Sequence, residues 1–334
     1  MANDHVILVT GATGMVGSVL TRQLVRGGAE VRIFRRPSST MELLGTAAEH
    51  VEHAEGDLRD ARSVLEAMQG VKQVYHAGAK VQFGARDRET LRAVNVEGTA
   101  HVMDAARRAG VDRVVHTSSM AAFGRPLREN GRIDEETPWR DAPHRSDYAR
   151  SKRAAELEVH RAIAEGLDAV IVNPALIFGT GRPGEGTRRI VDAVRREWIP
   201  AVPPGGTNVV DVEDVALGMR RAMMRGESGR RYFLGSENLT WAEILRTLAN
   251  AFGVEPPTRT VPAGLLRAGA YAAEAVGFLT RTDPVFSRSL AHTASHVYRY
   301  DNGRAREELG CTFRPFAATT RRIAGRIQDA PVRT

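Results

Sequence analysis

The chain has 334 residues, 42% of them hydrophobic, which is enough to bury the core of one large or two modest domains. Its formal net charge is +7, but arginines alternate with acids along segments such as 152–166 and no nucleic-acid motif accompanies them, so we expect no nucleic-acid partner. The single cysteine, Cys311, excludes an internal disulfide, and no Cys or His stands beside it at metal-ligand spacing, so we expect no metal site.

The elements of the first half alternate between short β-branched strands and longer amphipathic helices. The first strand is predicted in the apolar run HVILVT, which follows MAND directly. No charged leader or signal core precedes this run, so we expect a cytoplasmic protein. Further strands are predicted at 30–35, 73–78, 113–119 and 168–173, and helices at 15–26, 61–68, 88–109 and 147–165. This order predicts an α/β fold with a Rossmann-type, doubly wound parallel sheet.

The composition changes after Asn173, because GTGRPGEGTR and AVPPGGTN are too rich in glycine, proline and charge to lie inside an element. A strand and helix in VVDVEDVALGMRRAM resume the first pattern, and a strand at 230–235 and helices at 240–252 and 262–279 follow. We therefore expect a dinucleotide-binding Rossmann domain of residues 1–172 and 207–226. Residues 173–206 and 227–330 are expected to form a smaller C-terminal substrate-binding α/β domain.

The predicted helix at 262–279 is apolar, but Arg267 and Glu274 interrupt it. We expect no stable membrane span from it, because it falls short of an uninterrupted apolar run. A lid, a core element and a membrane-surface helix remain open.

Three glycines directly after the first strand are spaced GxxGxxG in TGATGMVG. The spacing alone is weak evidence in a chain with 32 glycines, but here it joins a strand to a helix. A tight turn, a close backbone approach to a pyrophosphate and free amide groups at the helix start each require a residue without a side chain, whereas a simple turn needs only one glycine. The loop residues expected to bind a dinucleotide are Gly11, Thr13, Gly14, Met15, Val16 and Gly17.

The end of the second predicted strand tests which dinucleotide binds. An acid there would accept hydrogen bonds from the 2′-hydroxyl of the adenine ribose, but the chain has Arg35 and Arg36. Guanidinium groups can bind a 2′-phosphate, so NADP(H) is favoured over NAD(H), with the start of a surface loop as the alternative. Asp57, after a further strand that precedes the helix predicted at 61–68, is placed where it could meet the adenine amino group.

The stretch RSDYARSK places Tyr148 and Lys152 four residues apart, on one face of a predicted helix. The chain has three lysines and six tyrosines, so this spacing arises by chance in about one such chain in twenty. An ammonium beside a phenol lowers the pKa of the phenol, so the tyrosine can exchange a proton near neutral pH. Ser118 and Ser119 end the predicted strand at 113–119, at the carboxyl edge of the sheet, where a serine hydroxyl can polarise a carbonyl.

Nine motifs follow in order along nearly the whole chain: TGATGMVG, GDLRD, HAGA, NVEGT, VVHTSS, YARSK, VNPALIFGTG, VVDVEDVA and DNGRAREELG. With them the chain resembles an extended short-chain dehydrogenase/reductase of the NAD-dependent epimerase/dehydratase superfamily. It is most similar to bacterial relatives of dihydroflavonol reductase and 3β-hydroxysteroid dehydrogenase. The resemblance implies a catalytic Ser119, a general acid/base Tyr148, and a Lys152 that binds the nicotinamide ribose and tunes the tyrosine.

The resemblance also implies functional roles outside this trio. Asn95 matches a catalytic position near the site, where an ordinary helix-stabilising role is an equal alternative. The matching motifs imply cofactor contacts at Leu58, Ala77, Gly78, Ala79, Thr117, Pro174 and Ile177. A homodimer through the helices at 88–109 and 147–165 is expected as well.

Within this family, the sequence favours an oxidoreductase that exchanges its cofactor over an enzyme that retains it. Residues 120–122 lack the acids that dehydratases carry after this strand, and Leu176 replaces an asparagine that nucleotide-sugar enzymes often have. Gly124 replaces an asparagine that meets the flavonoid in plant relatives. We therefore expect an NADP(H)-dependent reductase for the carbonyl, or dehydrogenase for the secondary alcohol, of a fairly apolar small molecule.

The residues expected at this substrate are Phe83, Met120, Phe123 and Leu176. Two alternatives remain: an NAD-dependent nucleotide-sugar epimerase, and a non-catalytic nucleotide-sensing protein. The second is disfavoured because such relatives usually lack the Tyr–Lys pair.

Overall fold

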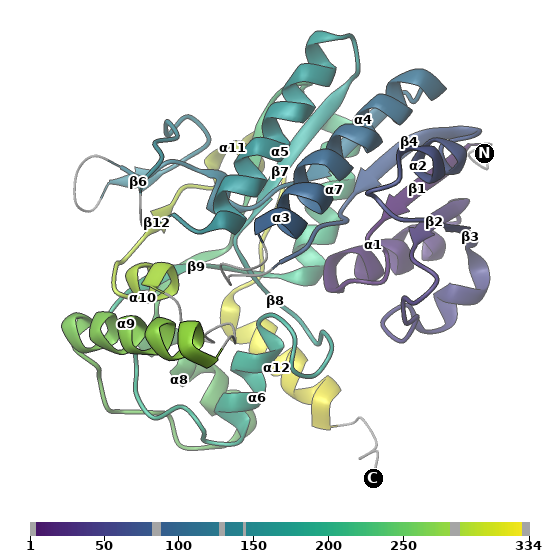
Figure 1. The fold of residues 1–334 in the computed structure, drawn as a ribbon. Coiled ribbons are helices and arrows are strands. Elements are labelled where there is room, and N and C mark those ends of the chain that lie inside the picture. Colours follow the sequence, from purple (N-terminus) through teal and green to yellow (C-terminus); the bar gives the residue numbers. More distant parts are fainter. Residues whose placement is uncertain (1–4, 82–87, 127–130, 143–144, 281–287, 329–334) are drawn as a thin grey trace.

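The computed structural model describes residues 5–81, 88–126, 131–142, 145–280 and 288–328. A seven-stranded sheet forms the centre of the molecule, and helices cover both of its faces (Figure 1). A smaller layer of helices and strands lies at one end of this sheet, below it in Figure 1. The predicted α/β fold with a Rossmann-like parallel sheet is confirmed.

The central sheet has the order β10–β7–β5–β4–β1–β2–β3, and all of its strands are parallel. Its strands are β1 (Val6–Thr10), β2 (Val31–Arg35), β3 (Glu52–Glu55), β4 (Val71–His76), β5 (Arg113–Thr117), β7 (Ala169–Pro174) and β10 (Arg231–Leu234). The chain builds outward from β1 in one direction and then, from β4, in the other. Such a reversal opens a crevice at the carboxyl ends of β1 and β4, where doubly wound sheets bind ligands.

Two hydrophobic layers cover the two faces of this sheet. One face packs against α1 (Met15–Arg26) and α7 (Val212–Arg225). The other packs against α2 (Ala61–Ala67), α4 (Gly98–Ala109) and α5 (Asp147–Ala164). Because strands buried on both faces must be apolar throughout, β7 is buried along its whole length.

The helix predicted over 88–109 is divided into three parts. α3 (Arg88–Leu91) leads into η3 (Arg92–Glu97), a π-helical stretch, before α4 continues. The wider π turn places Asn95 inside the protein, where it is fully buried. Helical spacing of apolar residues could not reveal this insertion, because it changes the phase of the helix by only one residue.

A second sheet has the order β11–β9–β8, with β8 (Leu176–Phe178) parallel and β11 (Glu237–Thr240) antiparallel to β9 (Gly206–Asp211). Its core is shared with α6 (Arg188–Arg195), α8 (Trp241–Phe252) and α12 (Phe316–Gln328). The remaining elements are η1 (Gly45–His50), η4 (Met120–Ala122), β6 (Arg132–Ile133), α9 (Ala263–Thr280), α10 (Arg288–Ala294), β12 (Arg299–Tyr300) and α11 (Gly303–Glu307).

Strand pairing differs in two places from the predicted division of the chain. β9 lies in the small sheet, although the sequence places 207–226 in the dinucleotide-binding domain. β10 joins the large sheet beside β7, although the sequence places 227–330 in the substrate domain. The reason is that a strand's sheet is chosen by long-range pairing, which its own sequence does not encode. The division into two domains otherwise stays a prediction.

The apolar helix α9 lies on the surface, with Leu265 65% and Tyr271 60% exposed and Ala270 buried. Among the helices that the structure describes, none is long and apolar enough to cross a membrane.

Candidate active site

Helix α5 carries the predicted Tyr–Lys pair toward the end of β5. Ser146 caps the helix by accepting a hydrogen bond from the Ala149 amide at 3.1 Å, and Asp147 adds negative charge to the first turn. The four-residue spacing then turns Tyr148 and Lys152 to the same buried side, 9% and 2% exposed. The helix start thus fixes both side chains at the carboxyl edge of the sheet.

The Tyr148 hydroxyl is hydrogen-bonded to the side chain of Ser119. Ser119 Oγ also accepts the Ala121 amide at 3.2 Å, so the start of η4 orients this serine. Burial raises the pKa of Tyr148 above its ordinary value, and the hydrogen bond from Ser119 offsets part of the rise. The pKa of Tyr148 therefore moves opposite to the sequence-based prediction: burial outweighs every lowering effect, and the phenol keeps its proton at neutral pH.

Lys152 is held in place by the backbone of β5: its Nζ donates to the Thr117 carbonyl at 2.7 Å. Burial lowers the pKa of this ammonium to about 8, and the Glu156 carboxylate acts in the opposite direction. Burial also lowers the pKa of His76, to about 3, and of His116. Both histidines are therefore neutral beside Lys152.

Asn95 reaches from η3 to the loop after β4 and to α5. Its Oδ1 accepts the Lys80 amide at 2.7 Å, and its Nδ2 donates to the Lys80 carbonyl and to Ser151 Oγ, both at 3.0 Å. These contacts engage both ends of its amide and tie the loop after β4 to α5. Its catalytic role stays a prediction.

The glycine loop leaves no room for side chains where a dinucleotide would approach. Gly11 has a φ of +69°, and a Cβ there would lie 2.6 Å from the Gly78 nitrogen. A Cβ at Gly17 would overlap the Gly11 carbonyl oxygen. Gly14 precedes α1 without a side-chain cap, so the first amides of α1 can meet an anion. The loop fits a dinucleotide pyrophosphate.

A buried chain of hydrogen bonds joins this loop to the strand beside it. The Gly78 amide donates to Thr10 Oγ1 at 3.1 Å, Thr10 Oγ1 lies 2.7 Å from His76 Nδ1, and His76 Nε2 lies 3.0 Å from Thr99 Oγ1. Thr99 Oγ1 donates to the Asn95 carbonyl at 2.6 Å. These directions assign the proton of neutral His76 to Nε2. These hydrogen bonds hold residues 76–79 (HAGA) against the glycine loop.

The remaining predicted cofactor residues lie at or near the carboxyl edge of the sheets. Leu58 follows β3, Ala77 and Ala79 follow β4, Thr117 ends β5, Pro174 ends β7, and Ile177 lies in β8. Gly78 packs against Leu58, since a Cβ on this glycine would lie 2.9 Å from Leu58 Cδ1.

The two arginines after β2 have different surroundings. Arg35 Nη2 lies 2.5 Å from Glu55 Oε1, and Arg35 Nε donates to His53 Nδ1 at 3.1 Å. Glu55 is the register partner of Arg35 across β2 and β3, so sheet pairing brings the two charges together. Arg36 is exposed. Of the two predicted phosphate ligands, Arg35 is already engaged with β3.

Asp57 also has a local partner. Its Oδ1 and Oδ2 accept hydrogen bonds from the Arg59 guanidinium at 3.0 and 2.7 Å, and these bonds lower the pKa of the carboxyl. Asp57 therefore stays ionised in this contact, and its carboxylate can accept a hydrogen bond from an adenine amino group.

Residues 7–235 match the NAD dependent epimerase/dehydratase family. The chain belongs to this family. It is 39% identical over 310 residues to "Sterol demethylase protein B" of Methylococcus capsulatus, covering 91% of this chain and 92% of that protein. It is 36% identical to a "Putative dihydroflavonol 4-reductase" of Synechocystis sp., covering 90% and 88%. The crystal structure of gox2253 superposes with a TM-score of 0.85 at 32% identity, covering 97% of this chain and 98% of that one.

Membership of the epimerase/dehydratase family confirms the resemblance drawn from the nine motifs. The protein is an oxidoreductase enzyme of the extended short-chain dehydrogenase/reductase type, and its cofactor is a nicotinamide dinucleotide. The glycine loop described above fits this cofactor on geometry alone.

The residues predicted to contact the substrate lie in different surroundings. Met120, directly after Ser119, is partly exposed. Leu176, at the start of β8, is partly exposed as well. Phe123 is fully buried and packs against Phe233, with ring centroids 5.9 Å apart. In this structure the Phe123 ring fills the hydrophobic core, and its contact with a substrate stays a prediction. Phe83 lies outside the described residues.

Gly124, where plant relatives carry a flavonoid-contacting asparagine, is closely covered by the backbone of Pro138. A Cβ at Gly124 would overlap the Pro138 carbonyl oxygen. No side chain could therefore occupy this position without moving the loop that contains Pro138.

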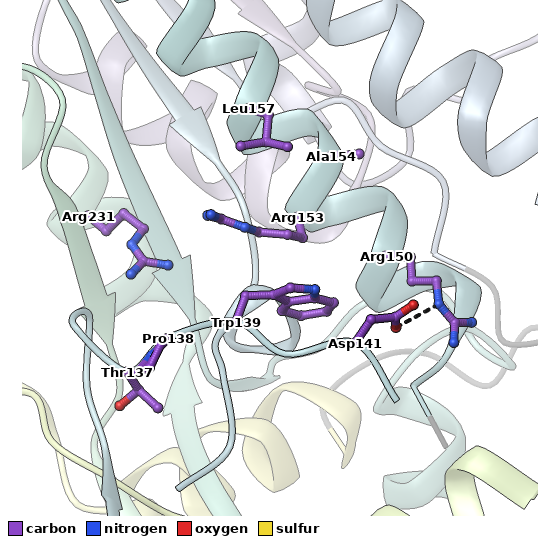
Figure 2. Close-up of a pocket in the computed structure, with 9 residues that line it drawn as sticks. All are labelled: Thr137, Pro138, Trp139, Asp141, Arg150, Arg153, Ala154, Leu157 and Arg231. Atoms are coloured by element: carbon purple, nitrogen blue, oxygen red, sulfur yellow. Dashed lines mark hydrogen bonds and ion pairs between the residues drawn. The ribbon is translucent and has the colours of Figure 1, made fainter. Parts of the chain in front are cut away.

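A pocket of about 580 Å³ lies along α5, and neither Tyr148 nor Lys152 is among the residues that line it (Figure 2). Its lining residues are Thr137, Pro138, Trp139, Asp141, Arg150, Arg153, Ala154, Leu157 and Arg231. Figure 2 shows the guanidinium groups of Arg153 and Arg231 reaching into it from α5 and β10. In the same pocket, Arg150 Nε donates to Asp141 Oδ1 at 3.0 Å.

Sequence reasoning missed two buried polar residues at the same edge of the sheet. Glu156 lies one turn after Lys152, and Asn173 lies in β7. The signal available for Glu156 was its spacing, since Tyr148, Lys152 and Glu156 form one i, i+4, i+8 series. A glutamate in a helix rich in surface acids does not reveal by itself that it faces inward.

Proposed function

We propose that the protein is an NADP(H)-dependent reductase for a carbonyl group on a largely apolar small molecule, and that Ser119, Tyr148 and Lys152 carry the reaction. The observation that carries this proposal is the buried Tyr148 hydroxyl, which is hydrogen-bonded to Ser119 on the same side of α5 as Lys152. A phenol is protonated at neutral pH at its ordinary pKa near 10, and burial raises the pKa of Tyr148 further. A protonated phenol at this place is the acid that carbonyl reduction needs.

In the proposed reaction, the bound nicotinamide supplies the hydride. Ser119 hydrogen-bonds the carbonyl oxygen and orients the carbonyl carbon. Tyr148 donates its proton to that oxygen as negative charge develops on it. Lys152 holds positive charge beside the tyrosine and, by family resemblance, binds the nicotinamide ribose.

The proposed preference for NADP(H) rests on Arg36. Arg35 is engaged with Glu55, so the exposed Arg36 is the guanidinium that can meet a 2′-phosphate without breaking an ion pair. β2 also ends without an acid that would accept the 2′-hydroxyl of NAD(H).

The proposed substrate class rests on the apolar side chains near the trio and on the relatives. Met120 and Leu176 offer thioether and hydrocarbon surface. The names of two relatives concern a sterol and a dihydroflavonol, both polycyclic and largely apolar. The covered Gly124 argues against the flavonoid contact of the plant enzymes, so a steroid-like or simpler aromatic ketone is the preferred class.

The test begins with the nucleotide released when purified protein is denatured. Near-stoichiometric NAD would overturn the proposal in favour of an epimerase that retains its cofactor. An empty site or partial NADP(H) is the expected result. A panel of steroid, aromatic and aliphatic ketones is then assayed with NADPH and NADH, with a Tyr148→Phe protein as the inactive control.

A further inference from the structure

The end of β5 contacts α5 at three positions that lie one helical turn apart: Tyr148, Lys152 and Glu156. The first two contacts involve Ser119 and the Thr117 carbonyl, as described above. In the third, the Ser118 hydroxyl donates to Glu156 Oε1 at 2.6 Å. Thr117, Ser118 and Ser119 thus each contact one residue of this series on α5.

Glu156 is fully buried, yet both of its oxygens have partners. Asn173 Nδ2 donates to Oε1 at 2.7 Å and also to the Ser119 carbonyl at 3.0 Å. Arg153 Nη1 donates to Oε2 at 3.2 Å, and Arg231 Nη1 lies 3.6 Å from the same atom. A buried carboxylate is tolerated only with such pairing, because desolvation of an unpaired charge is very costly.

The two oxygens of Glu156 face different parts of the protein. Oε1 points to the strand ends that carry the catalytic serine, whereas Oε2 meets the two arginines of the pocket along α5. Both arginines, Arg153 from α5 and Arg231 from β10, line the pocket drawn in Figure 2. One buried carboxylate therefore binds Ser118 and Asn173 through Oε1 and the two pocket arginines through Oε2.

The charge of Glu156 acts on Lys152, which lies one turn before it. The carboxylate favours the ammonium form of the lysine against the effect of burial. The other titratable groups around these two residues are Tyr148, His76 and His116 near Lys152, and Arg153, Arg231 and His160 near Glu156. His76 and His116 are neutral, and the arginines lie on the far side of the carboxylate, so Glu156 supplies the negative charge nearest to Lys152 among these groups.

We propose that Glu156 is a positioning residue of the active site, whose carboxylate fixes the Ser118–Ser119 turn and keeps Lys152 charged. It touches neither substrate nor cofactor and acts through its neighbours. The proposal rests on the proposed function only in assigning Lys152 to dinucleotide binding.

The experiment measures the dissociation constant of NADPH by quenching of intrinsic tryptophan fluorescence, from about pH 6 to about pH 9. In the wild type, affinity is expected to fall as Lys152 loses its proton near pH 8. In Glu156→Gln the fall is expected about one pH unit lower, which weakens binding roughly fivefold at pH 8. Glu158→Gln is the matched control, because Glu158 is on the same helix and pairs with Arg161 at 2.9 Å.

A second variant, Glu156→Asp, separates charge from geometry. It keeps the charge but withdraws the oxygens from Ser118 and Asn173, so the pH profile of NADPH binding should stay near that of the wild type, while kcat with the best ketone falls roughly tenfold. A Glu156→Asp profile shifted like that of Glu156→Gln would overturn the role of charge.

The remaining outcomes also decide whether Glu156 positions the active site or only stabilises the fold. Circular dichroism and thermal melting show whether each variant folds. If Glu156→Gln binds NADPH with the wild-type profile, or does not fold while Glu156→Asp keeps wild-type rates, Glu156 serves stability alone and the proposal is wrong. If the wild type itself binds no NADPH, the proposed function fails, and this result is distinct because it appears before any variant is compared.

Discussion

The two ends of the dinucleotide site are built in different ways. At the end of β5, buried polar groups have fixed partners: Lys152 binds the Thr117 carbonyl and Tyr148 is hydrogen-bonded to Ser119. At the end of β2, Arg36 is exposed, and the partly exposed Arg35 pairs with the exposed Glu55. Buried contacts are costly to lose and exposed ones are screened by water. The difference teaches that the proposed chemistry is preorganised, whereas the proposed preference for NADP(H) would depend on weaker electrostatic contacts at the surface.

The largest effect is expected from Tyr148→Phe, which removes the proton donor and leaves the ring in place. Loss of a general acid should lower kcat about a thousandfold, with little change in melting temperature or NADPH affinity. Steady-state kinetics with the best ketone measures this effect, and Tyr271→Phe on the surface of α9 is the control. Unchanged turnover would show that another group donates the proton.

Lys152→Arg is expected to lower kcat/KM about a hundredfold, because the larger guanidinium cannot reproduce the buried contact with the Thr117 carbonyl. Thermal melting should change far less than activity. Lys72→Arg, at a half-exposed position, is the control. Equal turnover in Lys152→Arg would contradict the assignment of Lys152 to the site.

The pH dependence of reduction should also follow Lys152. Its ammonium form is complete well below pH 8 and is lost above it, because burial lowers its pKa to about 8. Tyr148 stays protonated over this range, since burial raises its pKa. We therefore expect kcat/KM for reduction to be flat below about pH 8 and to fall about tenfold per unit above it. A profile flat to about pH 10 would exclude this role of the ammonium.

The smallest effects are expected at the β2 end, and they compare its two arginines. Arg36→Ala should lower the preference for NADPH over NADH roughly tenfold, the cost of one exposed charge-assisted contact to a phosphate. Arg35→Ala should change that preference less, because it breaks the pair with Glu55 instead. Ratios of kcat/KM for the two cofactors measure both, with Arg108→Ala as the control. A larger effect from Arg35 would reverse the assignment.

Patterns within one element were sufficient to predict much of this protein. The order of strands and helices, the glycine loop and the Tyr148–Lys152 pair all depend on local spacing. The structure has this order, and it places the loop and the pair at the carboxyl edge of the parallel sheet. The family could be assigned from the same motifs, because their order along the chain is independent of how the chain packs.

Contacts between distant elements were decided only by the tertiary structure. Pairing of β2 with β3 gave Arg35 its partner, packing against Phe233 buried Phe123, and the approach of β10 and β7 to α5 enclosed Glu156. The pKa of Tyr148 moved upward for the same reason, because its burial depends on the whole fold and not on the lysine four residues away. Local sequence sets which side chains share a helix face or a strand end, whereas desolvation and partner choice depend on residues that are far apart in the chain.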